Sequence, residues 1–294
     1  MLKEANGKKE ITLGMLQRRA KCKASPRCMR KHLHQAGIRF RRPRTKCLLS
    51  KEDVKERFRF AKKYRLKSTN WWLKHLQLHI DLKSFPVYAN AKARDHAARR
   101  EVRGHYRKRG EGLEEWYVAQ PKDQKFNTGH KPCRIAAGVG NGRVCLWEEI
   151  KGNWTGAKAA TLYAGPVKEA LRKTYPKKRS FALLEDNDPT GFKSKIAIKA
   201  KKANGIRVFE IPRRSPDLNV CDYALWKQVT RRMRLQEKKF RASKRETRAE
   251  YVERLRKTAK GLSRAFVTRA IGSMRKRCQR LYAAKGRHFE EGGL

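Results

Sequence analysis

The chain has 294 residues, 39% of them hydrophobic, which is enough to bury at least one core and excludes a wholly disordered tail. Its 76 Lys and Arg against 27 Asp and Glu give a formal charge of +49, which indicates a polyanionic partner, with nucleic acid as the first candidate. No run approaches the ~20 apolar residues of a membrane span, and residues 1–7 lack the apolar core of a signal peptide, so we expect a soluble intracellular protein, located in the nucleus.

Two short helices are predicted at the N-terminus, over residues 11–21 and 26–35, with a turn between them. Their apolar side chains at helical spacing are Leu13, Leu16, Met29 and Leu33. The cations outside this small core, which we assign to DNA binding, are Arg18, Arg19, Arg27, Arg30 and Lys31. These proportions are those of a helix-turn-helix domain, to which we assign residues 1–38, and a generic basic helical hairpin explains the segment equally well.

A basic stretch follows at residues 39–44 (RFRRPR), where the proline disfavours a helix and favours an extended path. Such a segment can lie along the minor groove of DNA, through Arg41, Arg42 and Arg44, although a solvated basic linker would have the same composition. Residues 50–64 then predict a helix with Ser50 as its N-cap. Residues 39–70 are therefore interpreted as a basic linker and helix.

From about Trp71 onward, short apolar runs between polar or glycine-bearing turns predict strands mixed with helices. One strand, residues 76–80, delivers Asp81 at its end, and another, residues 180–185, ends at Asp186. The other predicted elements are strands at 133–137, 143–149 and 206–211, a hairpin turn at 138–142, and helices at 161–174, 192–204 and 220–234. This alternation predicts a mixed α/β layer fold over residues 71–235.

Two further regions flank or interrupt this layer. Residues 104–130 are rich in charges and turn formers and are expected to form an irregular excursion from the sheet. Residues 236–294 are densely basic and mostly helical, with an apolar packing face. The seven cysteines have irregular spacing and no zinc-binding pattern, so we expect reduced thiols.

Carboxylates placed beside apolar strands in so basic a chain require a compensating group, because an unpaired buried charge is costly. Asp81 and Asp186 follow apolar strands, and Asp222 lies at the start of a helix. Three such acids can hold divalent cations through oxygen ligands and support an in-line displacement at phosphorus. Spacing alone leaves structural carboxylates paired with Arg or Lys as an equal alternative.

The sequence motifs around these acids resemble those of the mariner-type transposases of the DDE endonuclease superfamily. Residues 79–85 (HIDLKSF) resemble the first acidic motif of that family, residues 184–189 (LEDNDP) the second, and residues 215–226 (SPDLNVCDYALW) the third and most specific. The resemblance extends to the N-terminal helices, the Arg-Pro-Arg linker and the closing basic helix. It implies an RNase H-like, retroviral-integrase-like mixed sheet flanked by helices, preceded by a small helix-turn-helix domain and followed by basic C-terminal helices.

The resemblance also implies an activity. Asp81, Asp186 and Asp222 would bind Mg²⁺ or Mn²⁺ in a two-metal DNA endonuclease and strand transferase that cuts transposon ends and joins the freed 3′-hydroxyl to target DNA. A homodimer would hold the two DNA ends. In this assignment Asp188 is a capping or supporting residue, and Asp217 caps the turn before the last catalytic helix.

Two positions depart from the family pattern. Leu82 stands where an acid often follows the first catalytic Asp, and residues 190–192 (TGF) replace a usual His. The alternative function is therefore a catalytically inactive, transposase-derived DNA-binding protein. An RNA-binding protein would explain the charge but not the placement of the three acids.

Overall fold

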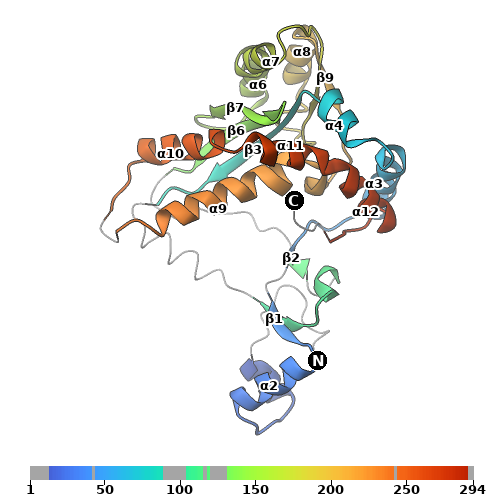
Figure 1. Cartoon of the computed structure of the whole chain (residues 1–294), viewed down its shortest axis with the longest axis vertical. Helices are drawn as coiled ribbons and strands as arrows, with labels where there is room; N and C mark the ends of the chain where they lie inside the picture. The colour runs from blue at the N-terminus through green and yellow to red at the C-terminus, as the bar shows by residue number, and fades with distance from the viewer. Residues whose placement is uncertain are drawn as a thin grey trace. The chain divides into compact units, whose positions relative to one another are not determined.

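The computed structural model describes residues 13–41, 44–88, 104–114, 118–119, 131–241 and 244–290 (Figure 1). The chain separates into two compact units. Unit 1 comprises residues 1–49, 94–125 and 288–290, and unit 2 comprises residues 50–93, 126–287 and 291–294. The division into four regions expected from the sequence stays a prediction.

Unit 2 is built on a five-stranded mixed sheet with the strand order β7-β6-β3-β8-β9. The strands are β3 (Leu78–Phe85), β6 (Cys133–Gly140), β7 (Arg143–Glu149), β8 (Phe181–Leu184) and β9 (Ile206–Phe209). Strands β3, β6 and β7 are antiparallel, whereas β8 and β9 run parallel to β3. The predicted fold class, a mixed α/β layer of the RNase H-like type, is confirmed.

The hairpin between β6 and β7 turns at Asn141 and Gly142, which have φ of 48° and 71°. Both values lie in the left-handed region that a two-residue hairpin turn of this kind requires, and Asn-Gly is the pair that adopts it most readily. The predicted hairpin is confirmed, but its turn is shorter than the predicted 138–142, because β6 continues to Gly140.

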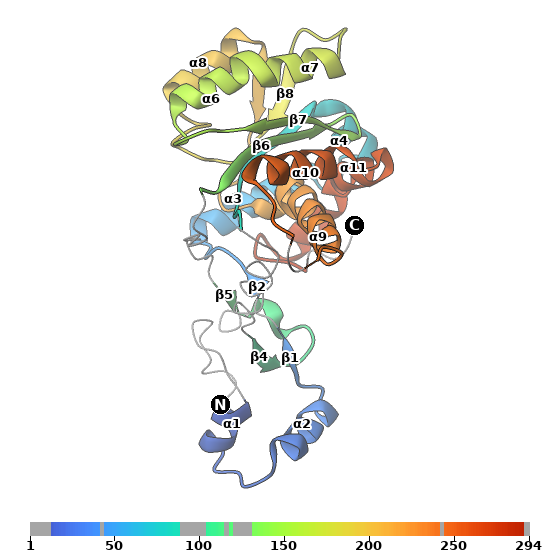
Figure 2. The same cartoon turned by 90° about the vertical axis from the view of Figure 1, so that its left-hand side faces the viewer.

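Helices cover both faces of this sheet (Figure 2). On one side lie α6 (Gly156–Leu162), the π-helical segment η3 (Tyr163–Val167), α7 (Lys168–Thr174) and α8 (Lys195–Ala203). The other side carries α9 (Trp226–Glu237), α10 (Arg248–Lys260) and α11 (Arg264–Gly272). Other α-helices among the described residues of the unit are α3 (Lys51–Tyr64), α4 (Thr69–His75) and α12 (Met274–Ala283).

The core between the sheet and its first helical layer explains why these segments fold together. Leu78 and Ile80 of β3, Leu183 of β8, Leu162 of α6 and Ala197 of α8 are almost completely buried in one apolar cluster. At about 25 cal/mol for each Å² of apolar surface removed from water, this burial is the main favourable contribution to folding. The helical spacing and the short apolar strands of the sequence thus converge on one core.

The strand that carries Asp81 differs from the expectation. The predicted strand ends before this residue, but β3 continues to Phe85, so Asp81 lies within the strand and pairs in register with Ala137 of β6. The reason is the antiparallel pairing to β6, which extends over seven residue pairs and supplies backbone partners well beyond the apolar run.

Unit 1 contains the predicted helix pair, α1 (Leu13–Arg19) and α2 (Pro26–Gln35), with Ser25 as the N-cap of α2. Its small core contains the four predicted residues together with Ile38 and Tyr106. Tyr106 comes from β4 (His105–Arg107), which pairs antiparallel with β1 (Arg39–Arg41).

The expectation of an irregular excursion over residues 104–130 is therefore wrong for its described part. In addition to β4, β5 (Val118–Ala119) pairs parallel with β2 (Arg44–Thr45). The excursion supplies strands to the basic linker, a pairing between residues more than 60 positions apart that the sequence pattern does not reveal.

Two general expectations can be compared with the structure. All seven cysteines are free thiols, as predicted. Within the described ranges, no helix has both the length and the apolar character needed to cross a membrane.

Candidate active site

The register of the central strands brings two of the predicted acids to the same level of the sheet. The parallel pairing of β3 with β8 joins Leu78 to Leu183 and His79 to Leu184. Asp81 and Asp186 each follow the second pair by two positions, one on β3 and the other just beyond the end of β8. Because side chains two positions apart on a strand point to the same face, the register sets the two carboxylates side by side.

The third acid, Asp222, lies in the π-helical segment η5 (Cys221–Leu225) that precedes α9. This segment is tied to β3 by two hydrogen bonds: the Asn219 side-chain amide donates to the carbonyl of Ile80 at 3.3 Å, and the Cys221 thiol donates to the carbonyl of His79 at 3.3 Å. Asp222 and Asp81 also share a side-chain hydrogen bond. The structure therefore brings all three predicted acids into one neighbourhood.

Burial raises the pKa of all three carboxyls, and charge repulsion raises it further for Asp186 and Asp222. Desolvation is the largest cause in each case. The negative charge of Asp81 then adds to it for Asp186, whose pKa rises to about 7, and for Asp222, whose pKa lies well above its ordinary value. The Trp226 indole donates to Asp81 Oδ2 at 2.5 Å, which opposes the rise in the pKa of Asp81.

The donor set suits a hard divalent cation. Three carboxylates supply oxygen ligands, and a cation bound to them would offset the burial and the repulsion that raise their pKa values. Across the part of the chain that the structure describes, however, no three His, Cys, Asp or Glu side chains already stand in a metal-binding arrangement. The chemistry of the three side chains nevertheless fits Mg²⁺ or Mn²⁺.

A buried triad that sequence reasoning missed fixes the chain next to Asp186. The Glu185 carboxylate pairs with Lys201 of α8 and accepts a hydrogen bond from the Tyr163 hydroxyl of η3. Lys201 also donates to the carbonyl of Phe192 at 2.8 Å. No local sequence signal distinguishes Lys201 from the other lysines of this basic helix, because its burial comes from the fold.

Asp188 has the capping role expected of it. Its carboxylate accepts from the backbone N–H groups of Thr190 and Gly191 at 3.1 and 2.9 Å, and from the Trp154 indole at 2.8 Å. An open pocket of about 510 Å³ lies here, lined by Asp186 and Asp188 among others. Substrate could therefore approach Asp186 from this side.

The predicted role of Asp217 is wrong. Instead of capping a turn, its carboxylate accepts hydrogen bonds at 2.8 and 2.6 Å from the Arg57 guanidinium, and both side chains are almost completely buried. The Arg277 guanidinium of α12 donates to the Asp217 carbonyl at 2.8 Å and lies 3.6 Å from the centroid of the Tyr223 ring. Helices α3 and α12 thus hold the turn that leads to Asp222.

The predicted DNA-binding cations fall into three groups. Those of α1, α2 and the adjoining turn are exposed: Arg18, Arg19, Arg27, Arg30 and Lys31. Arg41 and Arg44 are partly buried, and Arg44 pairs with Glu290 within unit 1. Arg42 lies outside the described residues.

Comparisons with known proteins agree with this architecture. Residues 1–66 match a helix-turn-helix family model described as "Transposase". No curated protein matches the chain. Among solved structures, a Mos1 mariner paired end complex with Mg has a TM-score of 0.66 at 17% identity, covering 95% of this chain and 76% of that one.

Two more solved structures give the same result. The chain is similar to a pre-cleavage Mos1 transpososome, with a TM-score of 0.65 at 15% identity over 95% of this chain and 76% of the other. For the catalytic domain of Mos1 mariner transposase the TM-score is 0.58 at 14% identity, covering 84% of this chain and 100% of that domain. The family match and the shared fold confirm the resemblance to mariner-type transposases.

Proposed function

From the fold that this chain shares with a mariner transposase, we propose that it is a DNA transposase whose Asp81, Asp186 and Asp222 cut and join DNA. The observation that carries the proposal is the gathering of three carboxyls, Asp81 buried and the other two partly buried, whose pKa values are all raised. Such groups are costly to bury without a function or a partner. Here their partner would be a divalent cation.

Mg²⁺ or Mn²⁺ bound to the three carboxylates would lower the pKa of the attacking water or 3′-hydroxyl and stabilise the leaving oxygen at phosphorus. The protein's own residues prepare this step. Trp226 donates a hydrogen bond to Asp81 Oδ2. The hydrogen bonds of Asn219 and Cys221 to β3 hold the chain next to Asp222, and the triad around Glu185 holds the chain next to Asp186. The reaction class is hydrolysis of a phosphodiester followed by strand transfer.

The partners follow from the same proposal. Solved Mos1 structures are described as paired end and strand transfer complexes. By analogy this chain would act as a homodimer that holds two transposon ends and then target DNA, in the nucleus, where chromosomal targets are found. The exposed cations of α1 and α2 would contact the ends.

A second candidate is a transposase-derived protein that binds DNA without cutting it. The observation that favours it is Leu82, an apolar residue directly after Asp81 on β3, at a position where the family pattern often has an acid. The two candidates predict the same DNA binding and differ only in catalysis.

The test is nicking of a supercoiled plasmid by the full chain with Mg²⁺ or Mn²⁺. Asp81→Asn, Asp186→Asn and Asp222→Asn are each expected to abolish nicking and to leave DNA binding intact. Glu210→Gln is the matched control, because it also replaces a carboxylate by its amide. Glu210 is exposed and forms a surface ion pair with Lys193. Binding by the wild type without any cation-dependent nicking would reject the enzyme and favour the second candidate.

A further inference from the structure

The connection between α9 and α10 concentrates positive charge outside the candidate active site. Residues 238–245 (KKFRASKR) contain five cations and no acid. The cations are all exposed: Lys238, Lys239, Arg241, Lys244 and Arg245. A chain with a formal charge of +49 exposes cations on many faces, so charge alone does not single out this one. The contacts that hold the ends of the connection do single it out.

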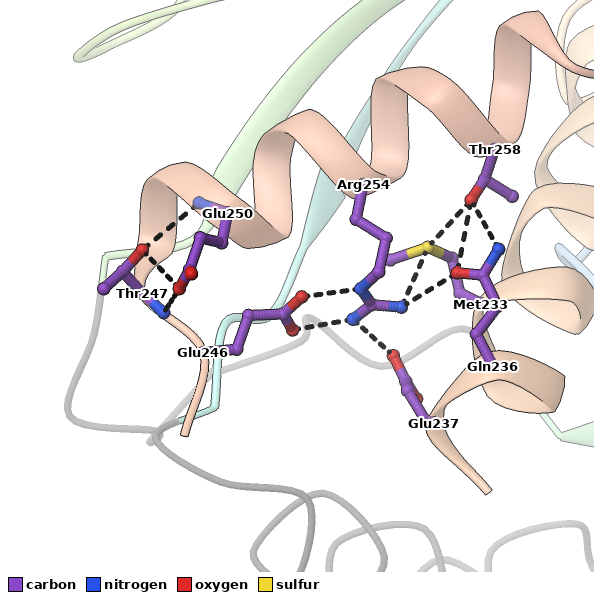
Figure 3. A network of polar contacts seen from close by, with 8 residues as sticks. All are labelled: Met233, Gln236, Glu237, Glu246, Thr247, Glu250, Arg254 and Thr258. Atoms are coloured by element: carbon purple, nitrogen blue, oxygen red, sulfur yellow. Dashed lines mark hydrogen bonds and ion pairs between the residues drawn. The ribbon is translucent and has the colours of Figure 1, made fainter. Parts of the chain in front are cut away.

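One guanidinium pins both ends of the connection (Figure 3). Arg254 of α10 donates to both carboxylate oxygens of Glu246, at 2.6 and 2.7 Å, and to Glu237 at 3.1 Å. Glu237 ends α9 and Glu246 precedes α10, and the three side chains are at most 15% exposed. The two flanking acids therefore point toward Arg254, while the cations between them face solvent.

Two further features order described residues at the ends of the connection. Lys244 Nζ lies 4.3 Å from the centroid of the Phe240 ring, and the Arg254 guanidinium lies 5.1 Å from the same centroid. At the start of α10, Thr247 and Glu250 form a capping box in which each side chain accepts the backbone N–H of the other (Figure 3). Ordered cations lose less conformational entropy when they bind an anion.

A row of cations on α9 leads to this connection. Arg231, Arg234 and Lys238 are exposed and spaced three and four residues apart, opposite buried Val229 and Met233. Helix α9 begins at Trp226, whose indole holds Asp81, and its 12 residues span about 18 Å. We define the α9–α10 surface as Arg231, Arg234 and the five cations of the connection.

We propose that the α9–α10 surface binds the phosphate backbone of the DNA duplex that passes the candidate active site. The inference rests on the proposed function, because that function supplies the duplex. Regularly spaced phosphates match a row of exposed cations next to the acids that Arg254 anchors, and such ion pairs position a duplex without reading its sequence. Arg254 acts as a positioning residue that holds the surface in place.

The test compares two triple variants of the full chain that lose the same charge. Lys239→Gln/Arg241→Gln/Lys244→Gln removes cations from the surface. Its control is Lys195→Gln/Lys199→Gln/Lys202→Gln on α8, where the three lysines are exposed on the opposite side of the sheet. Affinity for a labelled DNA duplex is measured across a salt series. The slope of log affinity against log salt is expected to fall by about 0.9 for each phosphate that the first variant no longer neutralises, and to stay at the wild-type value in the control.

A third variant, Arg254→Lys, keeps the charge but loses the planar fork that grips two carboxylates. By itself this substitution is expected to lower the slope of log affinity against log salt. Combined with the surface triple variant, it is expected to lower that slope little further, because both changes act on the same phosphates. Tryptophan fluorescence of each variant checks that it is folded.

Three results separate the proposals. Equal slopes for the surface and control triple variants would overturn the α9–α10 inference and leave plasmid nicking, and with it the proposed function, untouched. A wild type that binds DNA but does not nick it would reject the proposed enzyme and leave the α9–α10 inference standing. A wild type that binds no DNA would overturn both.

Discussion

The buried pair of Arg57 and Asp217 makes the most direct test of how unit 2 is held together. Arg57 is fully buried and makes five hydrogen bonds: to the carbonyls of Gly286 and Arg214, to the Ser215 hydroxyl, and to both oxygens of Asp217. The substitution Arg57→Met keeps much of the side-chain volume and removes every one of these donors. It leaves the Asp217 carboxylate buried with its cationic partner gone.

Removing one partner of a buried ion pair costs about 3–5 kcal/mol, because the remaining charge stays desolvated and unpaired. This is a large share of the roughly 5–15 kcal/mol that stabilises a typical domain. The double variant Arg57→Met/Asp217→Leu removes both charges and should regain most of that loss. The two substitutions are therefore expected to be strongly non-additive.

The assay is urea unfolding followed by tryptophan fluorescence, since all but one of the six tryptophans belong to unit 2. Arg59→Met is the matched control, because Arg59 lies on the same helix and is exposed. A loss below about 1 kcal/mol for Arg57→Met, or a double variant whose loss equals the sum of the two single losses, would refute the reasoning.

Three further predictions concern the acids and a helix end. In cation-free buffer the wild type should lose stability relative to Asp186→Asn as pH rises from 3.8 toward about 7. The reason is that over this range the folded chain still holds the Asp186 proton, which the unfolded chain has released. Thermal unfolding of both proteins across the range checks this, and a difference in stability that does not change with pH would contradict the raised pKa. Mg²⁺ at 100 times its Kd should raise the unfolding free energy of the wild type by about 2.7 kcal/mol and that of Asp222→Asn by less, and equal effects in a urea titration would argue against a site at Asp222. Ser50→Ala should cost about 1 kcal/mol by breaking the capping box with Asp53, whereas Ser50→Asp should retain most of the stability in the same titration.

Local patterns allowed many of the elements to be predicted. The spacing of apolar residues places α2 correctly, the Ser50 cap places the start of α3, and the turn formers at residues 138–142 place the connection between β6 and β7. These features depend on residues close in sequence, whose backbone preferences and capping hydrogen bonds act within a few positions.

The sequence also determined which acids to examine. The sequence motifs around Asp81, Asp186 and Asp222 indicated a shared site, and the structure brings the three into one neighbourhood. There the charge of Asp81 raises the pKa of both other acids. Their role as metal ligands stays a proposal. The sequence did not reveal that Asp81 lies within a strand, because that depends on how far β6 pairs along β3.

Only the tertiary structure decided the supports of the site. Arg57 and Asp217 are 160 positions apart, and Gln77 of the chain before β3 reaches Ala182 of β8 across 105 positions. In the sequence Lys201 is one more cation on a basic helix, and only the fold buries it against Glu185. Periodicity tells which face of an element is apolar, but it does not tell which distant side chain will meet a charge there. That choice is made by the packing of the whole core, since a buried charge is tolerated only where folding supplies its partner.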